Sequence, residues 1–366
     1  MKTLLFGIGF TLSAVVLVSM SQARVTGKCV NCHTMHNSQA GQAMATYGTS
    51  NPEGADTDPK VYLLRGTCFG CHAQMTSEAI VMIESSKIPQ VFHNFGQPGA
   101  DDLAGGNFAY ITGYKGAGAS DARGHNIVQL NNPDDTLSTP PGDQHATGIT
   151  NFNLTCAGKY GCHGERLVVG DYAAIRGGHH ADDSAIDGLT VGTSFRYLDG
   201  VKGVENNGPA YPWQDYNQNH HNEYKGSTTP GISGPTSPAG NTISGLCAEC
   251  HGYYHGVSQD EMGEYGHTPW RRHPTDVVLQ GTTHSGTNTL GEYASYGTYD
   301  VVAPIARPED NYTEDPSTVR PGTDIVMCLS CHGAHATNYF KLMRWNYRSW
   351  PGDGVNGCAV CHTSKD

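Results

Sequence analysis

The sequence predicts a chain of mostly irregular coil with short α-helices and little or no sheet. Hydrophobic residues make up only 37% of the 366 residues, whereas glycine contributes 47 and proline 19. A core of ordinary side chains would need more aliphatic residues and longer periodic segments at this length. The 12 cysteines recur in short groups that end in histidine. A large apolar group other than side chains is therefore expected to fill the interior.

The first residues are typical of a cleaved signal peptide at residues 1–23. Lys2 supplies a short positive region, an apolar stretch runs from Leu4 to Met20, and small residues end the segment at Ala23. A retained membrane anchor is the alternative, but the stretch is short for a span and contains Gly, Ser and Thr. We therefore expect export of a mature chain, residues 24–366, in which no later segment could cross a membrane.

The acidic composition restricts the partners of the protein. The formal net charge is −12, and removal of a signal peptide that contains Lys2 makes it more negative. Such a surface repels nucleic acid and anionic lipid, so neither is an expected partner. It is compatible with positively charged carriers or with metal cations.

Secondary structure is expected only in short pieces. Helical patterns are predicted at residues 76–86, at residues 338–347 and directly after His36. Turn-rich tracts separate them, and such tracts need cross-links to stay ordered. Residues 226–240, rich in Gly, Ser, Thr and Pro, are expected to form either a boundary between two lobes or a surface loop.

Five stretches carry the pattern Cys-x-x-Cys-His, the attachment signal of a c-type haem. Both cysteines bond covalently to the haem, and the histidine ligates its iron. A zinc half-site is the alternative for a single match, but zinc ribbons do not require that histidine. The five motifs are Cys29/Cys32/His33, Cys68/Cys71/His72, Cys247/Cys250/His251, Cys328/Cys331/His332 and Cys358/Cys361/His362.

The two remaining cysteines form a widened version of the same motif. Cys156 and Cys162 are separated by five residues instead of two, and His163 follows the second of them. A disulfide or two free thiols are the alternatives. We expect a sixth haem here, because the Cys-His ending is intact and six haems would use all 12 cysteines.

A second set of histidines is expected to bind the opposite faces of the irons, because the chain has 19 histidines and only six end a motif. His36, His255 and His335 follow a motif histidine by three or four residues, which on a helical turn places both rings on one face. Such a histidine cannot reach the far side of the iron held by its neighbour. It can reach the iron of an adjacent haem and fix the spacing of the two.

Further distal candidates are isolated histidines and histidine pairs. An isolated histidine elsewhere is more often a core or surface residue. His145, His267 and His284 are expected to be bystanders. The distal candidates are His93, His125 and His273, together with the doublets His179/His180, of which His180 is preferred, and His220/His221.

A row of closely spaced haems predicts electron transfer, because electron tunnelling falls steeply with distance. The first motif begins near residue 24, where the mature chain starts, and the last ends near Asp366. Haems are therefore expected near both ends of one elongated hexahaem domain, where each can exchange electrons with a partner.

Several of these stretches resemble the exported multihaem c-type cytochromes of metal-reducing bacteria, and among them the hexahaem OmcS-type family of extracellular cytochrome nanowires. The resemblance rests on "CVNCHTMHNS", "RGHNI", "RRHPTD", "CLSCHGAHA" and the terminal "CAVCHTSKD". It implies bis-histidine haems in a continuous stack, wrapped by coil and short helices. It also implies a homopolymer in which His36 ligates a haem of the next subunit. The spacing of Cys156 and Cys162 departs from the pattern.

The expected function is electron transfer to external acceptors such as metal oxides, at the cell surface or, alternatively, in the periplasm. Other exported cytochromes are expected partners. A monomeric carrier is one alternative. A multihaem reductase is another, but it needs a haem with an open axial position. All six motifs here end in histidine, and an enzyme is therefore not expected.

Overall fold

The computed structural model describes most of the chain between residues 25 and 363, and every structural statement below refers to these residues. The predicted signal peptide, His145, His255, His267, His284 and most of residues 226–240 lie outside them. The described residues are 25, 27–43, 59–73, 78–83, 86–94, 96, 101–143, 147–182, 184–206, 210, 212–228, 241–254, 273, 275–279, 295–308, 315–349 and 355–363.

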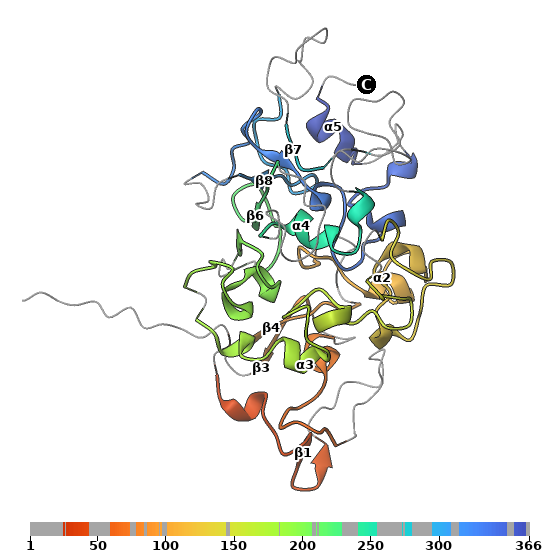
Figure 1. Ribbon diagram of the computed structural model, residues 1–366, viewed down its shortest axis with the longest axis vertical. Coiled ribbons are helices and arrows are strands. Elements are labelled where there is room, and N and C mark those ends of the chain that lie inside the picture. The colour runs from red at the N-terminus through yellow and green to blue at the C-terminus, as the bar shows by residue number, and fades with distance from the viewer. Residues whose placement is uncertain are drawn as a thin grey trace, which may run out of the picture.

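Irregular coil joins short helical segments (Figure 1). The α-helices are α1 (Cys68–His72), α2 (Ala109–Thr112), α3 (Asp171–Ala174), α4 (Ile243–Ala248) and α5 (Gly357–Cys361). The 3-10 turns are η1 (Cys29–Asn31), η2 (Asp121–Arg123), η3 (Val128–Leu130), η4 (Gly158–Tyr160), η5 (Gly178–His180), η6 (Val191–Thr193), η7 (Phe195–Tyr197), η8 (Gly252–Tyr254), η9 (Cys328–Ser330), η10 (Phe340–Leu342) and η11 (Tyr347–Ser349). Among the described helices, none is long and apolar enough to cross a membrane.

Three small sheets are present. The pairs β1 (Ser38–Gln39) with β2 (Gln42–Ala43) and β3 (Ile80–Ile83) with β4 (Ser86–Pro89) are antiparallel. The third sheet has the order β5-β6-β8-β9-β7, and only β6 and β8 in it run parallel. Its strands are β5 (Gly203–Val204), β6 (Glu223–Lys225), β7 (Val277–Val278), β8 (Ala306–Arg307) and β9 (Ile325–Val326).

The expectation of coil with short helices is confirmed, but the three predicted helices are wrong, and the little sheet expected takes the form of three small sheets. In the region predicted as a helix at 76–86, residues 80–83 form the strand β3, in which Ile80 pairs with Pro89 and Ile83 with Ser86 of β4. The apolar run read as a helix face contains two isoleucines and a valine, and β-branched residues favour strands. After His36 the chain enters the β1–β2 pair.

The segment 338–347 also differs from the helix that its pattern predicts. It contains a 3-10 turn in which Lys341 and Leu342 have φ values of 59° and 58°. Non-glycine residues rarely adopt this left-handed conformation, and it breaks an α-helix.

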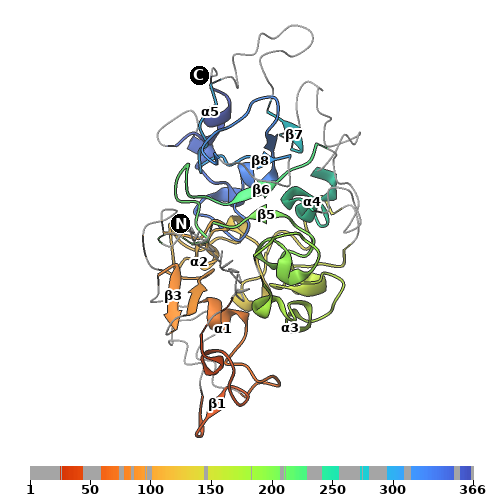
Figure 2. The same cartoon turned by 90° about the vertical axis from the view of Figure 1, so that its left-hand side faces the viewer.

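The described side chains form three small apolar clusters instead of one core. One lies around Phe69, Phe92 and Ile111, a second joins the central sheet to α4, and a third surrounds Tyr296. Figures 1 and 2 place β1 near one end of the long axis and α5 near the other. The first and last motifs therefore lie toward opposite ends of the molecule.

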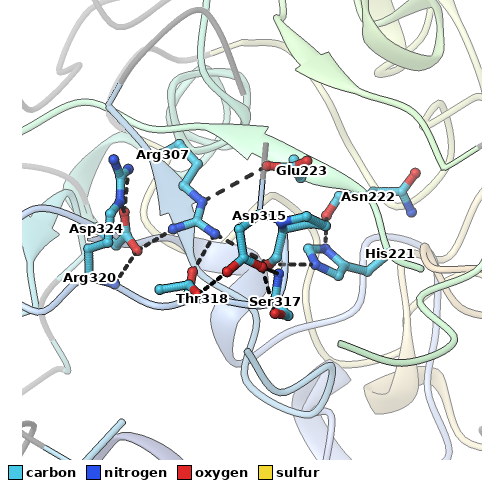
Figure 3. Close-up of polar contacts among 10 residues, drawn as sticks. His221, Asn222, Glu223, Arg307, Asp315, Ser317, Thr318, Arg320 and Asp324 are labelled. Atoms are coloured by element: carbon cyan, nitrogen blue, oxygen red, sulfur yellow. Dashed lines mark hydrogen bonds and ion pairs between the residues drawn. The ribbon is translucent and has the colours of Figure 1, made fainter. Parts of the chain in front are cut away.

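A buried ionic cluster supports the central sheet (Figure 3). Arg307 on β8 is 1% exposed, bonds to the Asp324 carboxylate and donates to the Thr318 carbonyl at 2.6 Å. Arg320 also bonds to Asp324, at 2.8 Å. Because a buried charge without its partner is costly, this cluster fixes the β8–β9 pairing just before the motif at Cys328.

Candidate functional site

The motif cysteines and histidines lie on single helical turns. In four motifs the backbone N–H of the histidine donates to the carbonyl of the first cysteine. These bonds are His33 to Cys29 at 2.8 Å, His251 to Cys247 at 2.9 Å, His332 to Cys328 at 3.1 Å and His362 to Cys358 at 2.8 Å. The fifth motif is α1 itself. Each motif thus presents its two sulfurs and its imidazole from one compact turn.

Polar caps begin the helices that carry three of these motifs. Thr67 accepts from the Gly70 N–H at the start of α1, and Thr242 accepts from the Gly245 N–H at the start of α4. Asn356 accepts from the first N–H groups of α5. These caps satisfy orphan donors and explain why such short helices form at these positions.

The widened motif closes in the same way as the others. The N–H groups of Cys162 and His163 both donate to the Cys156 carbonyl, at 3.2 and 3.0 Å. The additional residues form η4 (Gly158–Tyr160), which loops out and returns to the same closing bond. Gly158 has a φ of 75°, and a Cβ there would lie 2.6 Å from the Val168 carbonyl oxygen. The local geometry therefore resembles that of the five regular motifs, with three additional residues looped out between the cysteines.

A backbone carbonyl contacts the Nδ1 atom of five of the six motif histidines. This contact places the proton on Nδ1 and leaves the Nε2 lone pair free to ligate a metal. The Nδ1–oxygen distances are 3.0 Å for His33 and Leu63, 2.8 Å for His72 and Pro89, 2.8 Å for His163 and Arg196, 2.8 Å for His251 and Pro141, and 2.9 Å for His332 and Lys341.

Five of the six motif histidines face a second histidine ring. With a metal–imidazole bond of about 2 Å, two rings on opposite sides of one metal have centres about 6 Å apart. The centroid distances are 5.9 Å for His33–His180, 6.3 Å for His72–His179, 6.2 Å for His163–His335, 6.1 Å for His251–His125 and 6.1 Å for His362–His273. This spacing fits the chemistry of a bis-histidine haem.

The doublet at residues 179–180 serves two motifs, although only His180 was the preferred candidate. Both histidines lie on η5 (Gly178–His180), and His179 faces His72 while His180 faces His33. Adjacent side chains on a tight turn point in different directions, so one turn can reach two haems. The doublet itself was the sequence signal for this arrangement.

The sixth motif histidine, His332, faces no other histidine within the described part of the chain. Its ring is exposed, and Nδ1 is held by the Lys341 carbonyl. His36 is likewise exposed, and its Nδ1 contacts the Lys60 carbonyl at 2.8 Å. His36 therefore has the same carbonyl support as the motif histidines.

The remaining described histidines have other surroundings. His93, a distal candidate, is fully buried, with Nε2 3.5 Å from the Asp102 carboxylate. Its complete burial beside this carboxylate favours a structural role. His221 is buried and stacked on Tyr299 at 3.6 Å, with its ring nitrogens near two backbone carbonyls, and His220 is exposed.

Cysteines of consecutive motifs lie side by side at the first junctions. Burial raises the pKa of the Cys71 thiol to about 12, and Cys32 of the preceding motif adds to this shift. The sulfurs of Cys68 and Cys156 lie within 4.8 Å of one another, beside Asp171. The first, second and third motifs are therefore in contact in the order of the sequence.

The same order continues through the later motifs. Burial raises the pKa of Cys250 to about 12, with Cys162 as the next contributor. The Cys247 thiol hydrogen-bonds to Cys328, which together with burial raises its pKa. Burial also raises the pKa of Cys331 to about 12, and Cys361 adds to it. Each motif thus lies near enough to the next one along the chain for their cysteines to interact electrostatically.

The coil fold, the motif turns and the histidine pairs are together typical of a multihaem c-type cytochrome. The family described as "Doubled CXXCH motif" matches residues 321–366. The C-type cytochrome OmcS of Geobacter sulfurreducens is 25% identical over 371 residues, which cover 87% of this chain and 78% of that protein. These findings support an OmcS-type multihaem cytochrome, as the motifs predicted.

Two solved structures of the same cytochrome are also similar. One is an Outer Membrane Cytochrome S filament from Geobacter sulfurreducens, with a TM-score of 0.46 and 20% identity, covering 89% of this chain and 85% of that one. The other is a cryo-EM structure of the OmcS nanowires, with a TM-score of 0.46 and 19% identity, covering 94% and 92%.

Proposed function

We propose that this protein carries respiratory electrons through six bis-histidine c-type haems, as the exported subunit of an end-to-end polymer that serves external acceptors such as metal oxides. The observation that carries the proposal is the set of five histidine pairs at 5.9–6.3 Å. Random surface histidines would not face five different motif histidines at the spacing of a shared metal.

The proposal numbers the haems by the order of their motifs and gives each a pair of histidines. The haem, when bound, supplies the one-electron redox chemistry. The protein supplies two cysteines and two imidazoles for each haem. The pairs are His33/His180 for haem 1, His72/His179 for haem 2, His163/His335 for haem 3, His251/His125 for haem 4, His332 with a ligand from another subunit for haem 5, and His362/His273 for haem 6.

A linear path through the protein follows from the contacts between motifs. Cysteines of neighbouring motifs interact at all five junctions, by a hydrogen bond between Cys247 and Cys328, by sulfurs within 4.8 Å at Cys68 and Cys156, and electrostatically at the other three. Haems attached there are close enough for rapid tunnelling from one to the next. The path begins near the β1 end and finishes at α5, toward the opposite end of the long axis (Figures 1 and 2).

The polymer follows from two exposed histidines, His36 and His332, that face no motif histidine of their own chain in the described residues. His36 lies next to β1, whereas β8 of the central sheet, which precedes the His332 motif, lies in the other half of the molecule (Figure 1). His36 of one subunit can therefore complete haem 5 of another. Its backbone φ is 54°, and the next residue, Asn37, has a φ of 62° and donates its N–H to Thr34 at 3.0 Å. This strained, supported conformation holds the ring ready for binding.

Substitution of the η5 histidines tests the bis-histidine assignment. In the haem-loaded protein, His179→Ala and His180→Ala are each expected to convert one haem of six from low-spin to high-spin, because one axial ligand is lost. The double variant is expected to convert two. Electron paramagnetic resonance and the high-spin absorption band measure this change.

His220→Ala provides the matched control, since His220 is an exposed histidine that faces no motif histidine in the described chain. It is expected to keep every haem low-spin. Fully low-spin spectra in both η5 variants would contradict the proposed ligands of haems 1 and 2.

A further inference from the structure

A buried ion pair joins the third motif to the fourth. The Arg166 guanidinium binds the Glu249 carboxylate through two parallel bonds, Nε to Oε2 at 2.5 Å and Nη2 to Oε1 at 2.7 Å. The side chains are only 10% and 12% exposed. A third donor, Nη1, bonds to the Asp199 carbonyl at 2.9 Å. The bidentate geometry and the third bond fix the pair rigidly.

The two residues of this ion pair belong to two different motif segments. Arg166 follows His163, the proximal histidine of the widened motif, by three residues. Glu249 lies between Cys247 and Cys250, inside the fourth motif. The pair therefore ties together the two peptide segments that would hold haems 3 and 4, although 83 residues separate its members.

Both charges lie beside a cysteine of the fourth motif. Glu249 directly precedes Cys250 in the chain, and Arg166 is bonded to the Glu249 carboxylate. A haem bonded to Cys250 would experience the same two charges. In a buried environment a single unit charge has a larger effect than in water, because the effective dielectric constant is lower.

We propose that the Arg166–Glu249 pair sets both the spacing and the relative reduction potentials of haems 3 and 4. This inference rests on the proposed function, because it requires a haem at the widened motif. Reduction adds one negative charge to a haem. A nearby cation stabilises the reduced form and raises the potential, whereas a nearby anion lowers it. The paired charges balance one another at wild-type geometry, and either charge alone shifts the potentials.

The test compares Arg166→Gln, Glu249→Gln and the double variant in the full haem-loaded protein. Intact-mass measurement first counts the haems, and a spectroelectrochemical titration then follows the potentials. Glu249→Gln is expected to raise the potentials of two haems of six, and Arg166→Gln to lower those of the same two. The double variant is expected to return them close to the wild-type values, because both charges are gone.

Two further variants separate electrostatics from packing. Arg166→Lys keeps the charge but loses the bidentate geometry, so it is expected to lower the thermal midpoint with little shift in potential. Arg307→Gln removes a buried arginine from β8, a strand without a haem motif, and is expected to destabilise the protein without the opposed shifts.

Failure of this inference and failure of the proposed function give different results. Six haems with unshifted potentials in Glu249→Gln would overturn the proposed role and leave a purely structural ion pair. A wild-type protein with five haems, and with Cys156 and Cys162 unmodified, would instead overturn the proposed hexahaem function. If Arg166→Gln fails to mature, Glu249→Gln alone still decides the inference.

Discussion

Replacement of His36 by alanine is expected to abolish polymerisation and to leave one haem of six high-spin in every chain. His36 is exposed beside β1, and His332 faces no histidine within the described residues. If the two ligate one iron between subunits, loss of His36 removes a coordinate bond at every junction of the polymer. Negative-stain microscopy and electron paramagnetic resonance of the same preparation measure the two effects together.

Added imidazole separates the loss of the iron ligand from the loss of the link between subunits. It is expected to restore the low-spin signal of the His36→Ala variant without restoring polymers, because a free ligand fills the iron site but does not link subunits. His220→Ala serves again as the control and is expected to polymerise normally. Persistent polymers in His36→Ala would show that another contact joins the subunits.

Removal of the widened motif's cysteines, Cys156→Ala with Cys162→Ala, is expected to lower the haem count from six to five. The lost haem lies in the middle of the path, next to motifs two and four, so electron exchange between the two ends is expected to fall by orders of magnitude. Intact mass gives the haem count. Stopped-flow reduction and oxidation measure the exchange of electrons.

A deletion of the three additional residues of the widened motif is a matched control for that variant. Deletion of residues 158–160 leaves Cys156, Ala157, Gly161, Cys162 and His163 in sequence, which is a regular Cys-x-x-Cys-His motif. The closing bonds to the Cys156 carbonyl do not involve the deleted residues. The deletion is therefore expected to retain six haems, and a count of five in the wild-type protein would contradict the assignment.

The haem motifs could be predicted from the sequence because their chemistry is local. Each is a single turn closed by its own backbone, and even the extruded residues of η4 leave this closure intact. The coil-rich fold was predictable for a related reason, since the composition contains too few aliphatic residues for an ordinary core.

The distal partners could not be assigned from the sequence, because they depend on folding over long separations. His125 meets His251, and His163 meets His335, across more than a hundred residues each. The sequence could not show that both His179 and His180 face a motif histidine, because nothing local distinguishes the two members of a doublet.

The sheets were missed for a physical reason of the same kind. Strands of two residues, such as β8 (Ala306–Arg307), have no detectable alternation. Tertiary packing and the buried cluster around Arg307 determine their pairing. The hairpin of β3 and β4 was detectable in principle from the β-branched residues of its first strand, but its apolar run also fits a helix face.

Cryo-electron microscopy of the purified, haem-loaded protein tests the central claim most directly. The account predicts filaments with six haems per subunit, in which His36 of one subunit and His332 of its neighbour ligate the same iron. Discrete particles with haem 5 ligated from within its own chain would instead make the protein a monomeric carrier. A vacant axial position on that iron would contradict the bis-histidine account and favour an enzyme.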